Sequence, residues 1–227
     1  MTKKTVLVVA SHPDDEILGC GGTMAKLAQQ GANVYTLILG EGVTSRDEKR
    51  DRTKNVDKLS ELKAQCAEAN KIVGVKETFM CDFPDNRFDT VALLDIVKRI
   101  EQMKEKVAPD VIFTHHANDL NVDHKITYEA VLTATRPMKG ERVKEVYSFE
   151  VLSSTEWRYP LSFSPDVFID IETFVDKKCK AMAVYTSELK RYPHPRSIKG
   201  IELNAQCWGM KVGLNAAEVF KTVRAIK

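Results

Sequence analysis

The sequence lacks a strong excess of either charge, paired cysteines and any long run of apolar residues. Its 34 basic and 32 acidic side chains leave a net charge of +2, which gives no electrostatic reason to expect nucleic acid as a partner. The five cysteines are scattered, with no CxxC pair, so neither a disulfide framework nor a thiolate zinc site is expected. No apolar run could span a bilayer, and acidic residues follow the N-terminus too soon for a signal peptide. We therefore expect a cytoplasmic protein without stable membrane insertion.

The chain also shows no internal repeat, low-complexity segment or linker. Apolar residues make up 43% and charged residues 29% of its 227 positions, an ordinary balance for a globular protein. A chain of this length can bury a large core without disulfides or a structural metal. We expect residues 1–227 to form one domain.

Short β-branched runs alternate with segments of helical periodicity along the first two thirds of the chain. This alternation predicts an α/β fold, with a mostly parallel sheet sandwiched by helices. After residue 144 the pattern predicts two strands, one long helix and a helical tail. The expected strands are 5–10, 34–39, 77–81, 110–114, 145–151 and 166–171, and the expected helices are 17–30, 58–73, 91–107, 126–135 and 174–190.

The histidines are concentrated in two short segments. Four of the five lie in SHPDDE (11–16) and HHANDLNVDH (115–124), and each segment directly follows a predicted strand and carries aspartates. In open α/β sheets, functional sites form beyond the carboxyl ends of the strands, at the point where the strand order reverses. We therefore expect these two segments to converge.

Together the segments contain a plausible set of metal ligands. His12 and Asp15 are three residues apart at the start of a predicted helix, and His124 can add a third ligand from the other segment. Two imidazoles and one carboxylate suit Zn²⁺ and leave a coordination position for water. Asp14 could then accept a proton from that water, and Asp123, beside His124, could orient an imidazole.

Two other interpretations compete with a metal site. HPDDE alone could be a helix cap, because aspartates accept hydrogen bonds from free N–H groups at helix N-termini; the second cluster favours a metal instead. The glycines Gly19, Gly21 and Gly22 suggest a dinucleotide-binding turn. However, the position directly after the strand, where phosphate would bind, holds Asp14, Asp15 and Glu16, which would repel it.

Three motifs resemble the LmbE/PIG-L-like de-N-acetylases: HPDDE (12–16) followed by ILGCGGT, NDLNVDH (118–124), and YPHPRS (192–197). The resemblance implies a Rossmann-like sheet and a zinc-dependent hydrolase that removes an N-acetyl group from an amino sugar or its conjugate. It implies His12, Asp15 and His124 as zinc ligands and Asp14 as the catalytic base. Because family members often associate, it also implies a possible homo-oligomer.

The second motif departs from the HxDH sequence of many members, because Asn121 replaces the first histidine. An asparagine can donate a hydrogen bond to an oxyanion but cannot supply a proton. Either Asp14 returns its acquired proton to the leaving amine, or another group such as His194 supplies one. His194 could equally be a structural residue of its proline-rich loop.

Further polar residues follow the other predicted strands. Arg46 could bind substrate oxygens or be a solvated loop residue. The clusters 85–87 and 153–157 could line a sugar pocket, with Trp157 stacking on a ring, or form ordinary turns. Because His115 and His116 are adjacent, at most one should face the metal. The sequence also leaves open a related amidase acting on another amide, and a non-catalytic binding protein with this fold.

Overall fold

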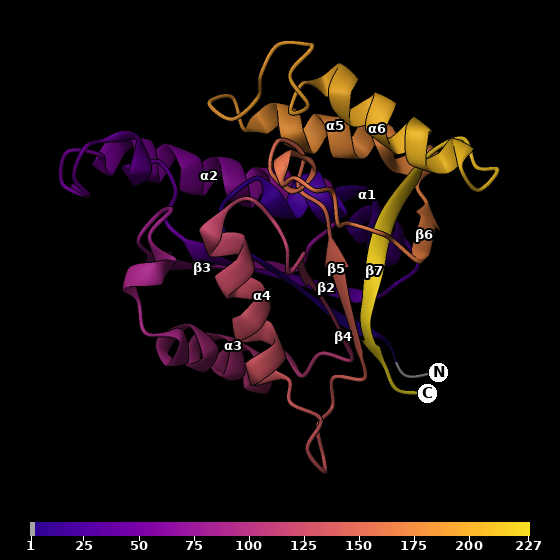
Figure 1. Ribbon diagram of the computed structural model, residues 1–227, viewed down its shortest axis with the longest axis horizontal. Helices are drawn as coiled ribbons and strands as arrows, with labels where there is room; N and C mark the ends of the chain where they lie inside the picture. Colours follow the sequence, from indigo (N-terminus) through magenta and orange to yellow (C-terminus); the bar gives the residue numbers. More distant parts are fainter. Residues whose placement is uncertain (1–2) are drawn as a thin grey trace.

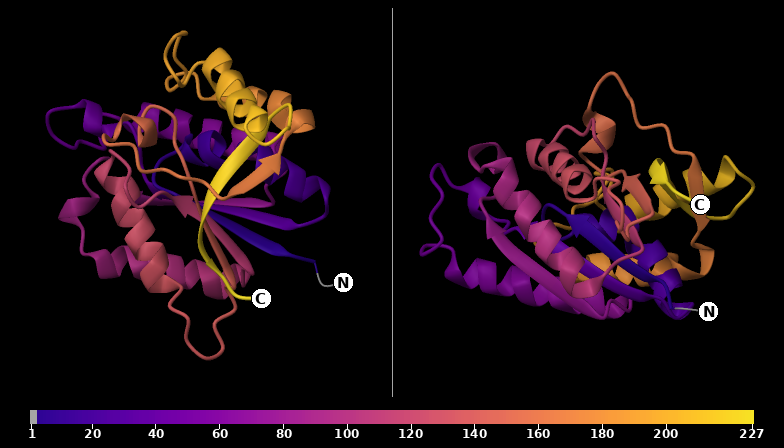
Figure 2. Two further views of the ribbon diagram at one scale, coloured as in Figure 1. Left: turned by 45° about the vertical axis from the view of Figure 1, so that its right-hand side comes forward. Right: turned by 90° about the horizontal axis from the view of Figure 1, so that it is seen from below.

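The computed structural model describes residues 3–227 and arranges them as a central sheet between two layers of helices (Figure 1). Figure 2 shows the same layers from two further directions. Along the chain the strands and α-helices are β1 Thr5–Ala10, α1 Asp15–Gln29, β2 Asn33–Gly40, α2 Val56–Ile72, β3 Glu77–Phe83, α3 Leu93–Val107, β4 Val111–His115, α4 Val122–Ala134, β5 Glu145–Phe149, β6 Val167–Asp170, α5 Val175–Val184, α6 Ile198–Met210 and β7 Ala217–Ala225.

The sheet has seven strands in the order β3-β2-β1-β4-β5-β7-β6. The first five in this order pair in parallel, whereas β7 runs antiparallel to both β5 and β6. The strand order reverses between β1 and β4, which pair directly from Val6 with Val111 to Val8 with Phe113. The predicted α/β class is therefore confirmed, and the two histidine-containing segments follow the two strands that flank the switch point.

Strand β1 divides its side chains between two cores. Val6 and Val8 face a core shared with α1, α2, α5 and α6, whereas Leu7 and Val9 face a core shared with α3 and α4. Figure 1 shows these two helix groups on opposite faces of the sheet. Both faces of the strand are buried, which explains why its sequence is continuously apolar rather than alternating.

The C-terminal third differs from the sequence-based prediction. The helix expected over 174–190 ends at Val184, and the tail expected to be helical contains helix α6 but also strand β7. Residues 217–225 pair with both β5 and β6. Their β-branched residues Val219, Thr222 and Val223 suit a strand, and the edge of β5 supplies backbone partners that no local pattern reveals.

A buried ion pair joins this C-terminal part to helix α1. The Lys178 ammonium lies 2.6 Å from the carboxylate of Glu218 and donates to the Leu18 carbonyl oxygen at 2.7 Å. Glu218 also accepts hydrogen bonds from the backbone N–H groups of Gly22 and Thr23, at 2.8 and 2.6 Å. Helix α5 and strand β7 are therefore both fastened to the helix that follows HPDDE.

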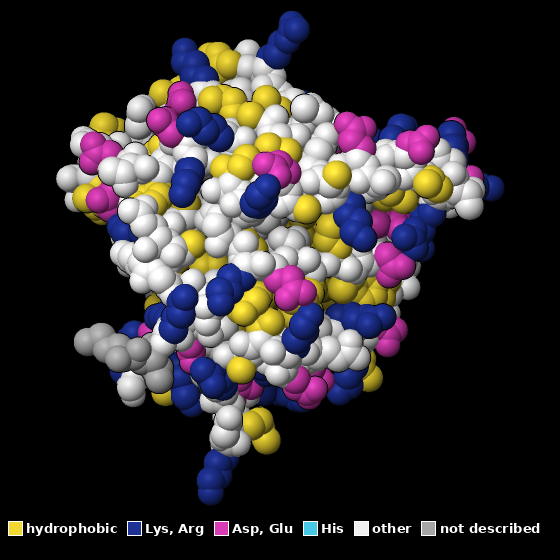
Figure 3. Space-filling view, turned by 180° about the vertical axis from the view of Figure 1, so that it is seen from behind, with side chains coloured by type: hydrophobic (Ala, Val, Ile, Leu, Met, Phe, Trp, Pro, Cys, Tyr) yellow, Lys and Arg dark blue, Asp and Glu magenta, His cyan; other side chains and the backbone are white. Residues whose placement is uncertain are grey.

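The surface carries interspersed charges. On the face shown in Figure 3, basic and acidic side chains alternate with small hydrophobic patches, and no histidine of the described residues is visible there. Over residues 3–227, no helix combines the length and apolar character required to cross a membrane.

Candidate metal centre and active site

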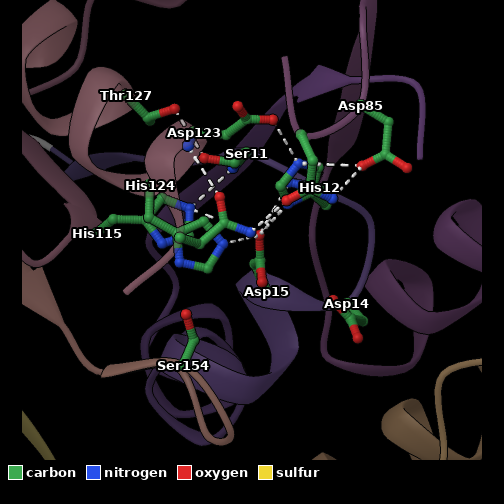
Figure 4. Close-up of polar contacts among 12 residues, drawn as sticks. Ser11, His12, Asp14, Asp15, Asp85, His115, Asp123, His124, Thr127 and Ser154 are labelled. Atoms are coloured by element: carbon green, nitrogen blue, oxygen red, sulfur yellow. Dashed lines mark hydrogen bonds and ion pairs between the residues drawn. The ribbon is translucent and has the colours of Figure 1, made fainter. Parts of the chain in front are cut away.

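The predicted ligands meet beyond the ends of β1 and β4 (Figure 4). His12 and Asp15 come from the turn between β1 and α1, and His124 lies in the first turn of α4. One atom from each of these three residues lies within 4.8 Å of the others. In Figure 4, Asp15 lies at the centre of the contacts from the histidines.

The two nitrogens of His12 face different carboxylates. Nδ1 lies 3.3 Å from Oδ2 of Asp15, whereas Nε2 is hydrogen-bonded to Oδ2 of Asp123 at 2.9 Å. Nε2 also lies 3.4 Å from Asp85, which follows β3. Although burial opposes it, these carboxylates raise the pKa of His12 well above its ordinary value. In the neutral tautomer with the proton on Nε2, Nδ1 would be free to bind a cation together with Asp15. A carboxylate that holds the distal nitrogen in this way is a common feature of metal-binding histidines.

His124 has a matching arrangement. Its Nε2 lies 3.2 Å from the same oxygen of Asp15, and its Nδ1 lies 3.1 Å from Oδ1 of Asp119. Asp119 in turn accepts hydrogen bonds from Thr155 Oγ1, at 2.5 Å, and from the Ser154 hydroxyl. Asp119 belongs to the second motif, but no role was predicted for it, because only the loop between β4 and α4 turns its carboxylate back onto His124.

These residues fit a divalent cation. Both ring nitrogens of His124 are buried without a hydrogen bond of good geometry. Burial alone would lower the pKa of His124, but Asp15 and Asp119 outweigh it and raise the pKa to about 9. The metal-free site therefore holds a proton among carboxylates, where a cation could take its place. Two imidazole nitrogens and one carboxylate oxygen suit Zn²⁺.

Asp14 lies beside this group in a strained backbone conformation. Its φ is 107°, in a region that residues with a side chain rarely adopt. The side chain is only 2% exposed, and burial, opposed by Arg196, raises the pKa of Asp14 well above its ordinary value. A raised pKa suits a carboxylate that must accept a proton near neutral pH.

A buried acidic network supports the strained turn. Glu16 accepts the backbone N–H of Asp14 at 3.0 Å, the Tyr185 hydroxyl at 2.5 Å and the side-chain amide of Asn70 at 2.9 Å. Burial raises the pKa of Glu16 to about 7. By contrast, although burial opposes it, contacts with His124 and His12 hold the pKa of Asp15 well below its ordinary value. Three successive carboxyl groups therefore have three different environments.

Arg196 reaches Asp14 from the loop between α5 and α6. Its Nη1 lies 2.9 Å from Oδ2 of Asp14, and its Nε donates to Ser153 Oγ at 2.7 Å and to the Leu152 carbonyl oxygen at 3.2 Å. The sequence contained a signal for this residue, the HPRS segment, but could not place it next to Asp14. The guanidinium joins the loop after β5 to Asp14.

The remaining predicted residues have these positions. Asn121 is the N-cap of α4: its Oδ1 accepts the N–H of Asp123 and its Nδ2 donates to Asn86, both at 2.8 Å. An oxyanion role for Asn121 stays a prediction, which would require the second N–H of that amide. Asp123 contacts His12 rather than His124, because adjacent helical residues point about 100° apart.

His194 and Arg46 lie on loops around this group. Nδ1 of His194 accepts the backbone N–H of Arg196 at 3.1 Å, so a neutral ring carries its proton on Nε2. Arg46 is paired with Glu188, which occupies the guanidinium expected to bind substrate. Their proposed roles in acid catalysis and substrate binding remain predictions.

Only one of the two adjacent histidines faces the group, as expected. His115 is buried, stacks on His124 with 3.9 Å between ring centroids and accepts the N–H of Ser11 at 2.8 Å. Burial lowers the pKa of His115 well below its ordinary value, so the ring is neutral at pH 7. His116 instead contacts Phe163.

Residues 7–135 match the model of the PIG-L family, whose description is GlcNAc-PI de-N-acetylase. The chain belongs to the PIG-L family. Among its relatives is an uncharacterised deacetylase, YaiS, of Escherichia coli, 29% identical over 82% of this chain and 92% of the relative. Another is a probable N-acetyl-α-D-glucosaminyl L-malate deacetylase of Bacillus cereus, 26% identical over 82% of this chain and 84% of the relative.

Solved structures of PIG-L-like fold extend the comparison. The N,N′-diacetylchitobiose deacetylase of Pyrococcus horikoshii superposes with a TM-score of 0.78 at 18% identity, over 98% of this chain and 85% of that one. The 4-carboxy-2-hydroxymuconate hydratase of Pseudomonas putida superposes with a TM-score of 0.75 at 23% identity, over 99% and 98%. At these identities the likeness concerns the fold alone.

Proposed function

We propose that this PIG-L protein is a zinc-dependent deacetylase that hydrolyses the N-acetyl group of an amino sugar or its conjugate. The observation that carries the proposal is the convergence of His12 Nδ1, Asp15 Oδ2 and His124 Nε2, with the buried Asp14 adjacent to Asp15 in the chain. Relatives described as sugar deacetylases support the reaction class. The substrate is a small N-acetylated molecule, not nucleic acid.

His12, Asp15 and His124 would hold the cation. Zn²⁺ in such a site supplies a Lewis acid that polarises the acetamide carbonyl and acidifies a water molecule. Asp123 and Asp119 keep the two imidazoles oriented, because each lies against the nitrogen that faces away from Asp15. These contacts fix the tautomer in which each ring presents a lone pair to the cation.

Asp14 accepts the proton of the attacking water. Arg196 holds Oδ2 of its carboxylate, which leaves Oδ1 for the proton. As the C–N bond breaks, Asp14 returns this proton to the nitrogen of the leaving amine, and acetate is the second product. This route needs no histidine at position 121. Asp85 is a further buried carboxylate beside His12, and its Oδ2 accepts the N–H and the hydroxyl of Ser45.

Metal analysis of the purified protein tests the site. We expect about one zinc per chain in the wild type and in His116→Ala, which removes a histidine that points away from the group. We expect no bound zinc in His124→Ala. A wild-type protein that binds no zinc after reconstitution would refute the proposal.

Acetate release from a panel of N-acetylated sugars tests the reaction. Asp14→Asn should keep its zinc and lose most turnover, whereas Asp89→Asn, an exposed control, should behave as the wild type. An unimpaired Asp14→Asn would eliminate Asp14 as the base. The fold also occurs in a hydratase, so a zinc-loaded protein that releases no acetate would direct attention to another amide or to addition of water.

A further inference from the structure

The exposed aromatic side chains of residues 3–227 lie in two loops. They are Trp157, Tyr159 and Tyr192, which are 43%, 74% and 54% exposed. The first two belong to the connection between β5 and β6, and the third to the connection between α5 and α6. We call these three residues the aromatic rim. Exposed apolar side chains that gather in one place often mark a binding site, whereas scattered ones do not.

Both loops are fastened to the residues of the proposed active site. Asp119, which orients His124, accepts hydrogen bonds from Ser154 and Thr155, at the start of the first loop. In the second loop, Arg196 contacts Asp14 and also reaches Ser153 of the first loop. The two loops that carry the aromatic rim are therefore both bonded to residues of the proposed active site.

The two loops meet beside the site. The ring of His194 packs edge-on against Trp157, with 5.7 Å between centroids. The first loop is also hydrogen-bonded to the loop after β4, because Arg158 Nε and Ser162 Oγ contact the Asn118 side chain at 3.3 and 2.8 Å. The Lys199 ammonium lies 4.5 Å from the ring centroid of Tyr192. The aromatic rim thus combines exposed rings with nearby polar and cationic groups.

We propose that the aromatic rim is a subsite for a second hexopyranose ring, linked to the acetamido sugar that is deacetylated. This proposal rests on the proposed function and narrows its substrate to a di- or oligosaccharide. A pyranose ring has an apolar face of C–H groups and an edge of hydroxyls. Aromatic rings cover the face, and the Tyr hydroxyl and Trp N–H can hydrogen-bond the edge.

The polar neighbours favour a sugar over a wholly apolar group. With Nδ1 occupied by the N–H of Arg196, neutral His194 has an N–H on Nε2 that can donate to a hydroxyl. The Lys199 ammonium lies over the Tyr192 ring, and Arg158 lies between Trp157 and Tyr159 in the chain. An alkyl chain laid here would cover these groups without offering them acceptors, which is unfavourable, whereas sugar hydroxyls offer acceptors.

The test compares acetate release by the zinc-loaded enzyme from N-acetylglucosamine, N,N′-diacetylchitobiose and an aryl N-acetylglucosaminide. We expect chitobiose to have the highest kcat/KM. Trp157→Ala and Tyr192→Ala should each reduce kcat/KM for chitobiose about tenfold, mainly through KM. Both should change kcat/KM for the monosaccharide less than about twofold. Met210→Ala, which removes an exposed side chain of α6, is the control and should change neither.

Four results would overturn the subsite. If the variants lose kcat/KM equally on the mono- and the disaccharide, the rings have only a structural role. If the wild type has equal kcat/KM for both sugars, there is no preference for a disaccharide. If kcat/KM is higher for the aryl glycoside than for the monosaccharide, and that for chitobiose is not, the rim would be assigned to an aglycone. If the wild type is a dimer and Tyr159→Ala is a monomer, the rim would be assigned to contact with a second copy of the chain.

A direct binding measurement separates this proposal from the proposed function. If neither sugar releases acetate, each is titrated into the zinc-loaded protein and tryptophan fluorescence is recorded. Tighter binding of chitobiose that disappears in Trp157→Ala would retain the subsite although the reaction assignment fails. Equal or absent binding of both sugars would overturn it.

Discussion

The guanidinium of Arg196 lies 2.9 Å from the carboxylate of Asp14, although 182 residues separate them in the chain. Asp14 otherwise has a buried side chain on a strained backbone. A cation held in place by Ser153 and Leu152 therefore holds the proposed base in position and favours its ionised form against the effect of burial. The relationship makes the late HPRS loop part of the proposed catalytic arrangement.

Substitution of Arg196 should lower turnover more than substrate affinity. We expect Arg196→Gln to reduce kcat by about 10²-fold, the usual order for losing one oriented charged donor, with KM changed less than about threefold. Arg196→Lys should recover only part, because one ammonium cannot contact Asp14 and Ser153 together as the forked guanidinium does. Steady-state kinetics with Arg191→Gln, an exposed control in the same loop, checks this. An Arg196→Gln enzyme with wild-type kcat contradicts the role.

Neutralising Asp119 should weaken metal binding. Asp119→Asn preserves the size of the side chain but removes the negative charge that lies 3.1 Å from Nδ1 of His124. Loss of such a partner usually costs 10- to 100-fold in metal affinity, and we expect a loss of about that size. Competition for zinc with a chelator measures it, and Asp95→Asn on the surface is the control. Unchanged affinity would show that His124 needs no such orientation.

A methyl group at Gly40 should disturb His12. A Cβ atom there would lie 2.8 Å from the Ser11 carbonyl oxygen and 3.2 Å from Cδ2 of His12, so the end of β1 must shift. We expect Gly40→Ala to lower zinc affinity at least about tenfold, by the same loss of ligand alignment. Gly140→Ala is the contrast, because no atom lies within 4 Å of its added Cβ although its φ is 91°. Gly140→Ala should lose some stability but keep the zinc affinity of the wild type. Equal zinc affinities in both variants would contradict this.

Removing the Lys178 ammonium should destabilise the whole fold. Lys178→Met leaves the buried carboxylate of Glu218 without its ion-pair partner, which typically costs about 3–5 kcal/mol. Urea unfolding should therefore show a lower midpoint with little change in slope. Lys178→Met combined with Glu218→Gln should recover part of the loss, since no unpaired charge then remains. A single variant as stable as the wild type would mean that the pair contributes nothing.

The contribution of Glu150 to stability should depend on pH. Burial raises the pKa of Glu150 above its ordinary 4.5, so the folded protein binds its proton more tightly than the unfolded chain does. That contribution is fully present below pH 4.5 and is lost as pH rises through the raised folded pKa. Trp208 and Asn204 both donate to Oε1, an oxygen that glutamine can retain.

Thermal unfolding of Glu150→Gln checks this dependence. We expect its Tm to match the wild type at pH 4 and to exceed it at pH 8, by roughly 2–4 °C for each kcal/mol in a chain of this length. Glu129→Gln, at an exposed position, should show no such difference. A gain that is the same at both pH values would assign the effect to packing rather than to charge.

Local motifs were enough to predict the central part of the fold and the convergence of the proposed ligands. His12, Asp14 and Asp15 share one turn, and His124 follows a strand that the apolar pattern identified. The rule that sites form at the switch point then brought the two segments together. Each step needed only residues close in sequence or a general property of parallel sheets.

The contacts that sequence reasoning missed are long-range or depend on the path of a loop. Arg196 reaches Asp14 only because the α5–α6 loop crosses the site, and nothing within the HPRS segment specifies that crossing. Asn121 precedes a helix, so its position predicts an N-cap as well as a catalytic donor, and the structure engages it as the cap. The tail was predicted as helical, which is confirmed for α6 but wrong for β7, because that strand is defined by partners far along the chain.

The placement of β7 determines when the sheet can be completed during synthesis. Among the described residues, β6 pairs with β7 alone, and β7 also covers the outer edge of β5. A growing chain that has reached α6 therefore has one strand without a partner and one open parallel edge, both prone to pair with other molecules. Until residues 217–225 emerge from the ribosome, the nascent protein is at its most vulnerable to aggregation.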